Sequence, residues 1–149
     1  GFQFVESEIE EAAGSNAERN GIMTNAGLKF INDAMASAQI PYEFMEYTSS
    51  IDSISAYWVG EYNEVESFNE DGQQETQFIL TGTGKEWDEL EAQKNKIKKL
   101  FPGIQGRRAI LGDGSGIAVF YGNAFPIATV DGFLKRIQIN LTVKEWRTE

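Results

Sequence analysis

The chain of 149 residues contains neither cysteine nor histidine, which excludes disulfide bonds, thiol nucleophiles, imidazole acid–base chemistry and histidine-ligated zinc. A hydrophobic fraction of 41% is typical of a folded protein, and the length suits a single domain with one core. The formal net charge of −10 disfavours binding to the phosphates of nucleic acids. We therefore expect a protein with no enzymatic activity, no metal and no cofactor.

Residues 1–22 are acidic and rich in small side chains, and we interpret them as a flexible leader before a single domain at residues 23–149. The sequence has no apolar run of about 18 residues, the length that spans a membrane. Its opening also lacks the basic start and long apolar core of a secretion signal. We therefore expect a protein that is made in the cytoplasm and does not contact a membrane.

The domain is expected to open with a helix capped by Thr24 or Asn25. Pro41 is expected to stop this helix. Residues 42–47 alternate imperfectly between polar and apolar and predict a short strand, before a serine-rich loop at residues 48–55. The apolar residues of the helix recur at three- and four-residue intervals, which predicts one buried stripe of Leu28, Ile31, Met35 and Ala38.

A hairpin follows, with a first strand that begins at Ala56 and a return strand at residues 75–81. Residues 69–72, Asn-Glu-Asp-Gly, supply the turn, because Asp-Gly tolerates the positive φ angles of tight hairpins. Alternation places Trp58 and Tyr62 on one face of the first strand. In the return strand, the consecutive apolar residues predict cover from both faces: Phe78, Ile79 and Leu80.

A second helix is predicted at residues 87–101, because acidic residues lie in its first turns and lysines in its last, the order that the helix dipole favours. Pro102-Gly103 ends it. Gly82-Thr83-Gly84-Lys85 is interpreted as the turn that leads into it. Its buried stripe is expected to comprise Trp87, Leu90, Ile97 and either Leu100 or Phe101.

Two more strands are predicted at residues 108–111 and 117–121, joined by a glycine-rich loop. A loop that contains Pro126 then leads to a last strand at residues 133–146, where apolar residues from Phe133 onward alternate with polar ones. The sequence therefore predicts an α+β fold, in which an antiparallel or mixed β-sheet carries two main helices on one face.

Two glycine-rich stretches resemble ligand loops but lack the residues that the chemistry needs. A phosphate-binding loop at residues 82–85 would need glycine in place of Ile79 and a hydroxyl residue in place of Glu86. A glutamate at the start of the helix would also repel a triphosphate. Asp113 is not followed by the spaced oxygen ligands of a calcium loop. We therefore interpret both stretches as ordinary connections.

Charge is unevenly distributed along the chain, because no basic residue lies between Lys29 and Lys85. The acidic candidates for an interaction surface are Glu61, Glu64, Glu66, Glu70 and Asp71. Glutamates on one strand face could form an acid–base pair, but water normally solvates such carboxylates. This region is a solvated acidic face, a surface that repels an anion, or a surface for a basic partner. The basic candidates, expected to meet the acidic region of a neighbouring copy, are Lys94, Lys98, Arg107 and Arg108.

Several segments form a recognisable order: Ile40-Pro-Tyr-Glu-Phe, Ala56-Tyr-Trp-Val-Gly-Glu-Tyr, the Asp71-Gly72 turn with Phe78-Ile-Leu-Thr-Gly after it, the helix from Trp87 to Phe101, and Lys135-Arg-Ile-Gln-Ile-Asn-Leu-Thr-Val-Lys-Glu-Trp. In the order and character of these elements, from Thr24 onward, the chain resembles a tail-terminator (tail-completion) protein of long-tailed bacteriophages or prophages. The acidic leader departs from that pattern.

The resemblance implies a structural subunit that forms a homo-oligomeric ring of six, caps the tail tube at its head-proximal end and supports head–tail joining in the virion. It implies contacts with the tail tube protein and the head–neck connector protein, while DNA passes through the ring without specific binding. The acidic run suits a lumen that repels phosphates. The alternative is an acidic DNA mimic that inhibits a basic nucleic-acid enzyme, which salt-sensitive binding would favour.

Overall fold

The computed structural model describes residues 23–46, 56–63, 73–111, 114–129 and 132–146. The predicted leader, the loop at residues 48–55 and the hairpin turn at residues 69–72 lie outside these ranges. Within them the elements are, in chain order, α2 (Asn25–Ser37), β1 (Tyr42–Phe44), β2 (Ala56–Asn63), β3 (Gln73–Gly84), α3 (Trp87–Leu100), β4 (Arg107–Ile110), β5 (Gly116–Ile127) and β6 (Lys135–Trp146).

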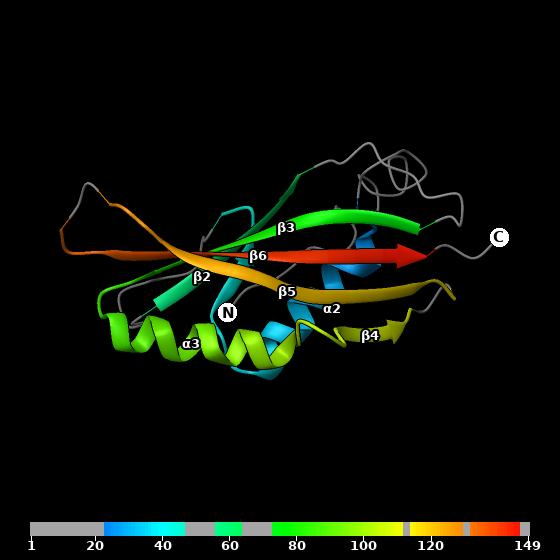
Figure 1. The fold of residues 1–149 in the computed structure, drawn as a ribbon, viewed down its shortest axis with the longest axis horizontal. Coiled ribbons are helices and arrows are strands. Elements are labelled where there is room, and N and C mark those ends of the chain that lie inside the picture. Colours follow the sequence, from blue (N-terminus) through cyan, green and yellow to red (C-terminus); the bar gives the residue numbers. More distant parts are fainter. Residues whose placement is uncertain (1–22, 47–55, 64–72, 112–113, 130–131, 147–149) are drawn as a thin grey trace.

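The described strands form one six-stranded sheet in the order β1-β2-β3-β6-β5-β4 (Figure 1). β1 is parallel to β2, whereas the remaining neighbours are antiparallel, so the sheet is mixed. β3 and β6 pair along their whole lengths, from Gln73 opposite Trp146 to Gly84 opposite Lys135. These two strands therefore set the long axis of the molecule, and β1 and β4 are the edge strands.

β6 shows why one face of the sheet is buried. Its alternate residues from Ile137 to Glu145 are buried, while Arg136 is exposed and Lys144 is half-buried on the opposite face. This alternation confirms the strand predicted from period-two hydrophobicity. The strand begins at Lys135, however, and Phe133, which was expected to begin it, lies in the preceding turn and is 84% exposed.

Both helices cover this buried face of the sheet, which we call the inner face. The indole Nε1 of Trp58 on β2 donates a hydrogen bond of 2.7 Å to Oε1 of Gln93 on α3. At the other helix, the Thr24 hydroxyl donates a hydrogen bond of 2.6 Å to Oε2 of Glu145 on β6. By register, Trp58 and Glu145 lie on the same side of the sheet. The predicted fold class, α+β with a mixed sheet and two helices on one face, is confirmed.

α2 begins as the sequence predicts and ends earlier than expected. Thr24 is its N-cap, and the Thr24 hydroxyl accepts a hydrogen bond of 2.9 Å from the amide of Gly27. The helix ends at Ser37, before Pro41, because Gln39 adopts a left-handed φ of 59° and the Ile40 amide turns back to the carbonyl of Met35. Pro41 therefore follows a helix end that has already formed.

The glycines of β2 and β3 make room for aromatic side chains. A Cβ atom at Gly82 would lie 2.6 Å from two ring atoms of Trp58, and a Cβ atom at Gly60 would lie 2.6 Å from the Tyr42 hydroxyl and 2.7 Å from the Phe78 ring. Gly82 and Gly84 belong to β3, so the interpretation of residues 82–85 as a turn was wrong for the glycines. In this position, Gly82 lets the indole lie flat on the strand.

Three other predictions need correction. Trp87 is 39% exposed rather than buried, and the buried stripe of α3 consists of Leu90, Gln93 and Ile97, followed by Phe101. Ile79 is only half-buried, because both helices lie on the other face of the sheet. Pro126 lies inside β5 rather than in a loop, at a part of the strand beyond its pairing with β4. Proline is tolerated there because β4 pairs only with residues 116–119, so the later part of β5 has a described strand neighbour on one side alone and not every amide needs to donate.

Candidate interaction surfaces

The described residues contain no group of three or more acidic, cysteine or histidine side chains placed to hold a metal ion. No helix within the described ranges is long and apolar enough to cross a membrane. The buried carboxylate of Glu145 is engaged in structure, since it accepts hydrogen bonds from the Thr24 hydroxyl and, at 3.4 Å, from the Thr24 amide.

The four predicted basic residues do not form one patch. Lys94 forms an ion pair of 2.6 Å with Glu91, and both residues lie on α3. On β4, register places Arg107 on the inner face and Arg108 on the opposite, helix-free face. The predicted basic residues therefore lie on both faces of the sheet near its β4 edge, with Lys98 on the inner face.

Aromatic rings hold several of these cations in place. The ammonium of Lys98 lies 5.7 Å from the centre of the Tyr121 ring, on the inner side. On the helix-free face, Arg108 and Lys144 lie 5.6 and 5.5 Å from the centre of the Phe120 ring. A cation that lies over the face of an aromatic ring is attracted by the negative charge of that face. Burial raises the pKa of Tyr121, the Lys94 charge lowers it and the Glu91 charge raises it, so this phenol stays neutral at physiological pH.

Of the five predicted acidic residues, the structure places one. Glu61 is exposed, and its register opposite Ile79 puts it on the helix-free face of the sheet. The other four lie outside the described residues: Glu64, Glu66, Glu70 and Asp71. The same face carries both signs of charge, because half-buried Glu75 is opposite Lys144 and exposed Arg136 lies further along β6.

α3 carries opposite charges at its two ends. Its 14 residues span about 20 Å, and the helix runs along the long axis of the sheet (Figure 1). The exposed charged residues at the start are Glu86, Asp88 and Glu89, with exposed Lys85 directly before them, and those at the end are Lys96, Lys98 and Lys99. The predicted charge order along this helix is therefore a charge gradient along the surface of the molecule.

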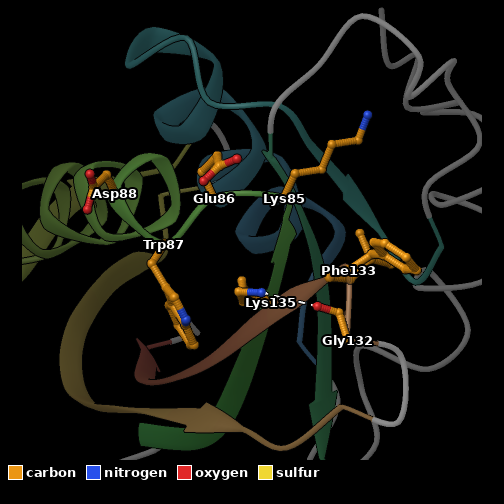
Figure 2. A pocket seen from close by; sticks show the side chains of 8 residues that line it. Lys85, Glu86, Trp87, Asp88, Gly132, Phe133 and Lys135 are labelled. Carbon is orange, nitrogen blue, oxygen red and sulfur yellow. Dashed lines mark hydrogen bonds between the residues drawn. The ribbon is translucent and has the colours of Figure 1, made fainter.

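A cleft of about 590 Å³ lies where α3 begins, and we call it the hairpin end. Figure 2 shows Trp87 and Phe133 on either side of Lys135, whose ammonium donates a hydrogen bond of 3.4 Å to the carbonyl of Gly132. Both rings reach solvent, at 39% and 84% exposure. Residues 85–88 line one side of the cleft and residues 132–135 line the other.

A second, smaller groove of about 380 Å³ lies on β4 and its neighbours, and we call it the β4 groove. Its most exposed apolar residue is Ile110, at 78%. The two surfaces lie at opposite ends of the sheet, because Lys135 and Trp146 are the first and last residues of β6, roughly 37 Å apart along an extended strand. The groove is lined by Arg108, Ala109, Ile110, Gly116, Ile117 and Trp146.

Sequence reasoning missed both surfaces. It assigned Trp87 and Phe133 to buried positions because each extends a periodic apolar pattern by one step. One signal was available for Phe133, since the preceding Asp131-Gly132 is a typical turn pair and argues against a strand. No comparable signal distinguishes Ile110, which belongs to a short strand whose two faces cannot be assigned without the sheet order.

Comparisons with known proteins extend the fold assignment. No protein-family model matches the chain, and no curated protein matches it significantly. One solved structure, which carries no functional name, is similar with a TM-score of 0.56 and 15% sequence identity. The similarity covers 98% of this chain and 99% of that chain. At this level of identity, the similarity shows a shared fold along nearly the whole chain.

Proposed function

We propose that the chain is a structural subunit of a long-tailed bacteriophage or prophage, which closes into a ring at the head-proximal end of the tail tube. The ring, of six subunits, caps the tube protein, provides a docking surface for the head–neck connector and lets DNA pass without binding it specifically. The order of elements through the whole domain, which resembles that of tail terminators, supports the choice of this class.

The charge gradient on α3 is the observation that carries the proposal. A surface that is acidic at one end and basic at the other is complementary to a second copy whose opposite end meets it, either head to tail or in an antiparallel twofold pair, and not to one whose like ends meet. The mass of the assembly separates these arrangements, because the twofold pair stops at two copies. Repeated head-to-tail contacts generate a ring when the rotation between subunits closes. Because the charged groups are exposed, salt should weaken their attraction.

A charge-swap experiment tests this proposal. One variant carries Lys96→Glu and Lys99→Glu, which makes both ends of α3 acidic, and the other carries Glu86→Lys and Glu89→Lys, which makes both ends basic. Circular dichroism of each variant checks that it is folded. In size-exclusion chromatography with light scattering, the wild-type chain should form one discrete oligomer, and each variant alone should be mostly monomeric because like charges meet at every contact.

An equimolar mixture of the two variants gives the decisive test. Every contact between unlike variants then restores opposite charges, so the mixture should form an alternating ring with an even number of subunits. Assembly of each variant alone to the wild-type oligomer would contradict the proposal. A wild-type chain that stays monomeric at every concentration and binds a basic nucleic-acid enzyme in a salt-sensitive way would instead identify it as the DNA mimic.

A further inference from the structure

We infer that β4 is a docking edge, on which an extended acidic segment of a partner protein adds as a further strand of the sheet. The added strand runs antiparallel to β4 and places carboxylates opposite Arg107 and Arg108 and an apolar side chain opposite Ile110. This docking takes place on a single subunit and does not depend on ring closure, so the ring and the docking edge can fail separately.

The backbone of β4 is bonded on one side and open on the other. β4 is the last strand of the described sheet on this side, and its only described strand neighbour is β5 (Figure 1). The Leu111 amide donates a hydrogen bond of 2.7 Å to the Ser115 carbonyl, across the turn that joins these strands. Because successive residues of a strand point their backbone groups to opposite sides, Ala109 also bonds β5, whereas the N–H and C=O groups of Arg108 and Ile110 point away from it.

An extended peptide satisfies the open backbone groups of this edge. Among the described residues, neither the Arg108 amide nor the Ile110 amide has a partner in a turn, loop or cap. A residue placed opposite each of them would exchange both N–H···O bonds with it, which is the basis of strand addition. The phosphates of a nucleic acid only accept hydrogen bonds, so they would leave the two carbonyls without a donor. The edge therefore fits a peptide strand better than a nucleic acid.

The two arginines of β4 select an acidic segment. Arg107 and Arg108 form no ion pair with a described residue. A guanidinium binds a carboxylate through two parallel hydrogen bonds, which makes arginine a strong partner for acidic side chains. Arg108 is already held in place, because its Nε donates a hydrogen bond of 2.8 Å to the Gln105 carbonyl and its guanidinium lies 5.6 Å from the centre of the Phe120 ring. Binding therefore costs less side-chain entropy than it would for a free arginine.

The register of β4 sets the order of side chains in the added strand. Arg108 and Ile110, which is 78% exposed, lie on the helix-free face, while Arg107 and Ala109 lie on the inner face. Residues directly opposite each other in an antiparallel pair share a face. From its N-terminus to its C-terminus, the partner segment therefore has an apolar residue, one residue opposite Ala109 and then two acidic residues. A second β4 strand does not fit this edge, because it would bring the arginines of two copies onto one ladder.

Synthetic peptides test this order of side chains on the natural chain. The probe is the acetylated and amidated peptide Ser-Thr-Val-Thr-Glu-Glu-Thr-Ser, and the control, Ser-Thr-Glu-Glu-Thr-Val-Thr-Ser, has the same composition in the opposite order. In fluorescence anisotropy the probe should bind at least tenfold more tightly than the control, and replacement of both glutamates by lysine should abolish binding. Equal affinities for the two orders would show attraction by charge alone and would overturn the inference.

Methylation of the peptide backbone separates strand addition from attraction by charge. In the expected pairing, the amide of the first glutamate faces Arg108, whereas the amide of the threonine before it faces solvent. N-methylation of that glutamate should weaken binding at least tenfold, and N-methylation of that threonine should change it less than threefold. In saturating probe, hydrogen exchange of the Arg108 and Ile110 amides should slow at least tenfold, while that of Ala109 should change little. A bound probe that slows neither amide would contradict strand addition.

A charge reversal on β4 gives the last readout. The double variant Arg107→Glu with Arg108→Glu, checked for folding by circular dichroism, should lose the glutamate probe and bind the lysine peptide instead. Lys29→Glu with Arg136→Glu is the matched control and should bind the probe within twofold of the natural chain, because these exposed cations lie on α2 and β6. A natural chain that binds neither peptide order would show that the arginines only protect the edge from aggregation, and a duplex oligonucleotide that binds through them without slowing Ile110 exchange would identify a nucleic-acid surface. Either result overturns the docking edge and leaves the ring to its own test.

Discussion

The contact between Gly82 and Trp58 gives the sharpest prediction about stability. The indole of Trp58 is fully buried against β3, and a Cβ atom at Gly82 would come within 2.6 Å of two of its ring atoms. The ring cannot simply move away, because its Nε1 donates a hydrogen bond of 2.7 Å to Gln93 on α3. Gly82→Ala should therefore push the sheet and the helix apart at the centre of the core.

The expected loss in the free energy of unfolding is about 2 kcal/mol. Overpacking of a core costs about 1–3 kcal/mol, and a weakened buried hydrogen bond adds about 1 kcal/mol. Alanine offsets about 0.5–1 kcal/mol of this loss, because glycine loses more backbone entropy on folding. The overpacking and hydrogen-bond terms exceed the entropy term, so the sign of the effect is fixed even though alanine is the better strand residue.

Urea unfolding followed by tryptophan fluorescence measures this loss. Gly132→Ala is the matched control, since no heavy atom lies within 4 Å of its Cβ position, and its effect should be within about 0.5 kcal/mol. In a Trp58→Phe background the smaller ring leaves space, so Gly82→Ala should cost at least about 1 kcal/mol less than in the natural chain. An equal cost in both backgrounds would refute the proposed clash.

Three other predictions concern a buried hydroxyl, a buried phenol and the acidic run. Among the described residues, the buried hydroxyl of Thr76 has no hydrogen-bond partner, so Thr76→Val should stabilise the protein by about 1 kcal/mol in urea unfolding; a loss of stability would show that the hydroxyl is satisfied. Burial raises the pKa of Tyr42 above its ordinary value of 10.0, so above pH 10 the unfolded chain releases a proton that the folded chain keeps. Stability should then fall as the pH rises, by up to about 1.4 kcal/mol per pH unit, and Tyr42→Phe should make this dependence shallower. Charge reversal at Glu61, Glu64 and Glu66 should leave the thermal unfolding of the subunit within a few degrees of the natural chain and yet impair maturation of phage particles; fully infectious particles would show that these residues do not line a lumen.

The sequence was sufficient for features that depend on local pattern. The alternation along β6 and the capping residue of α2 follow from side-chain direction and from the hydrogen bonds of one helical turn, and the structure has both. The charge order of α3 is likewise a local property of the helix dipole. The fold class followed from these elements in sequence.

Features that depend on distant neighbours were not predictable. Gly82 is a strand residue because Trp58, 24 positions away in the sequence, lies over it, and no local rule reveals that contact. Pro126 is tolerated within β5 only because β4 is too short to cover that part of the strand. Trp87 and Phe133 lie at the end of the sheet, so the apolar periodicity that includes them continues past the core.

The native mass of the chain tests the central claim most directly. If subunits join head to tail through unlike surfaces, mass spectrometry under non-denaturing conditions should show one closed oligomer of six copies, whose population falls as the ionic strength rises. The number of copies should not grow with protein concentration once the ring has closed. A single-chain mass at every concentration, or an open series of dimers, trimers and longer chains that never converges on one mass, would contradict the account.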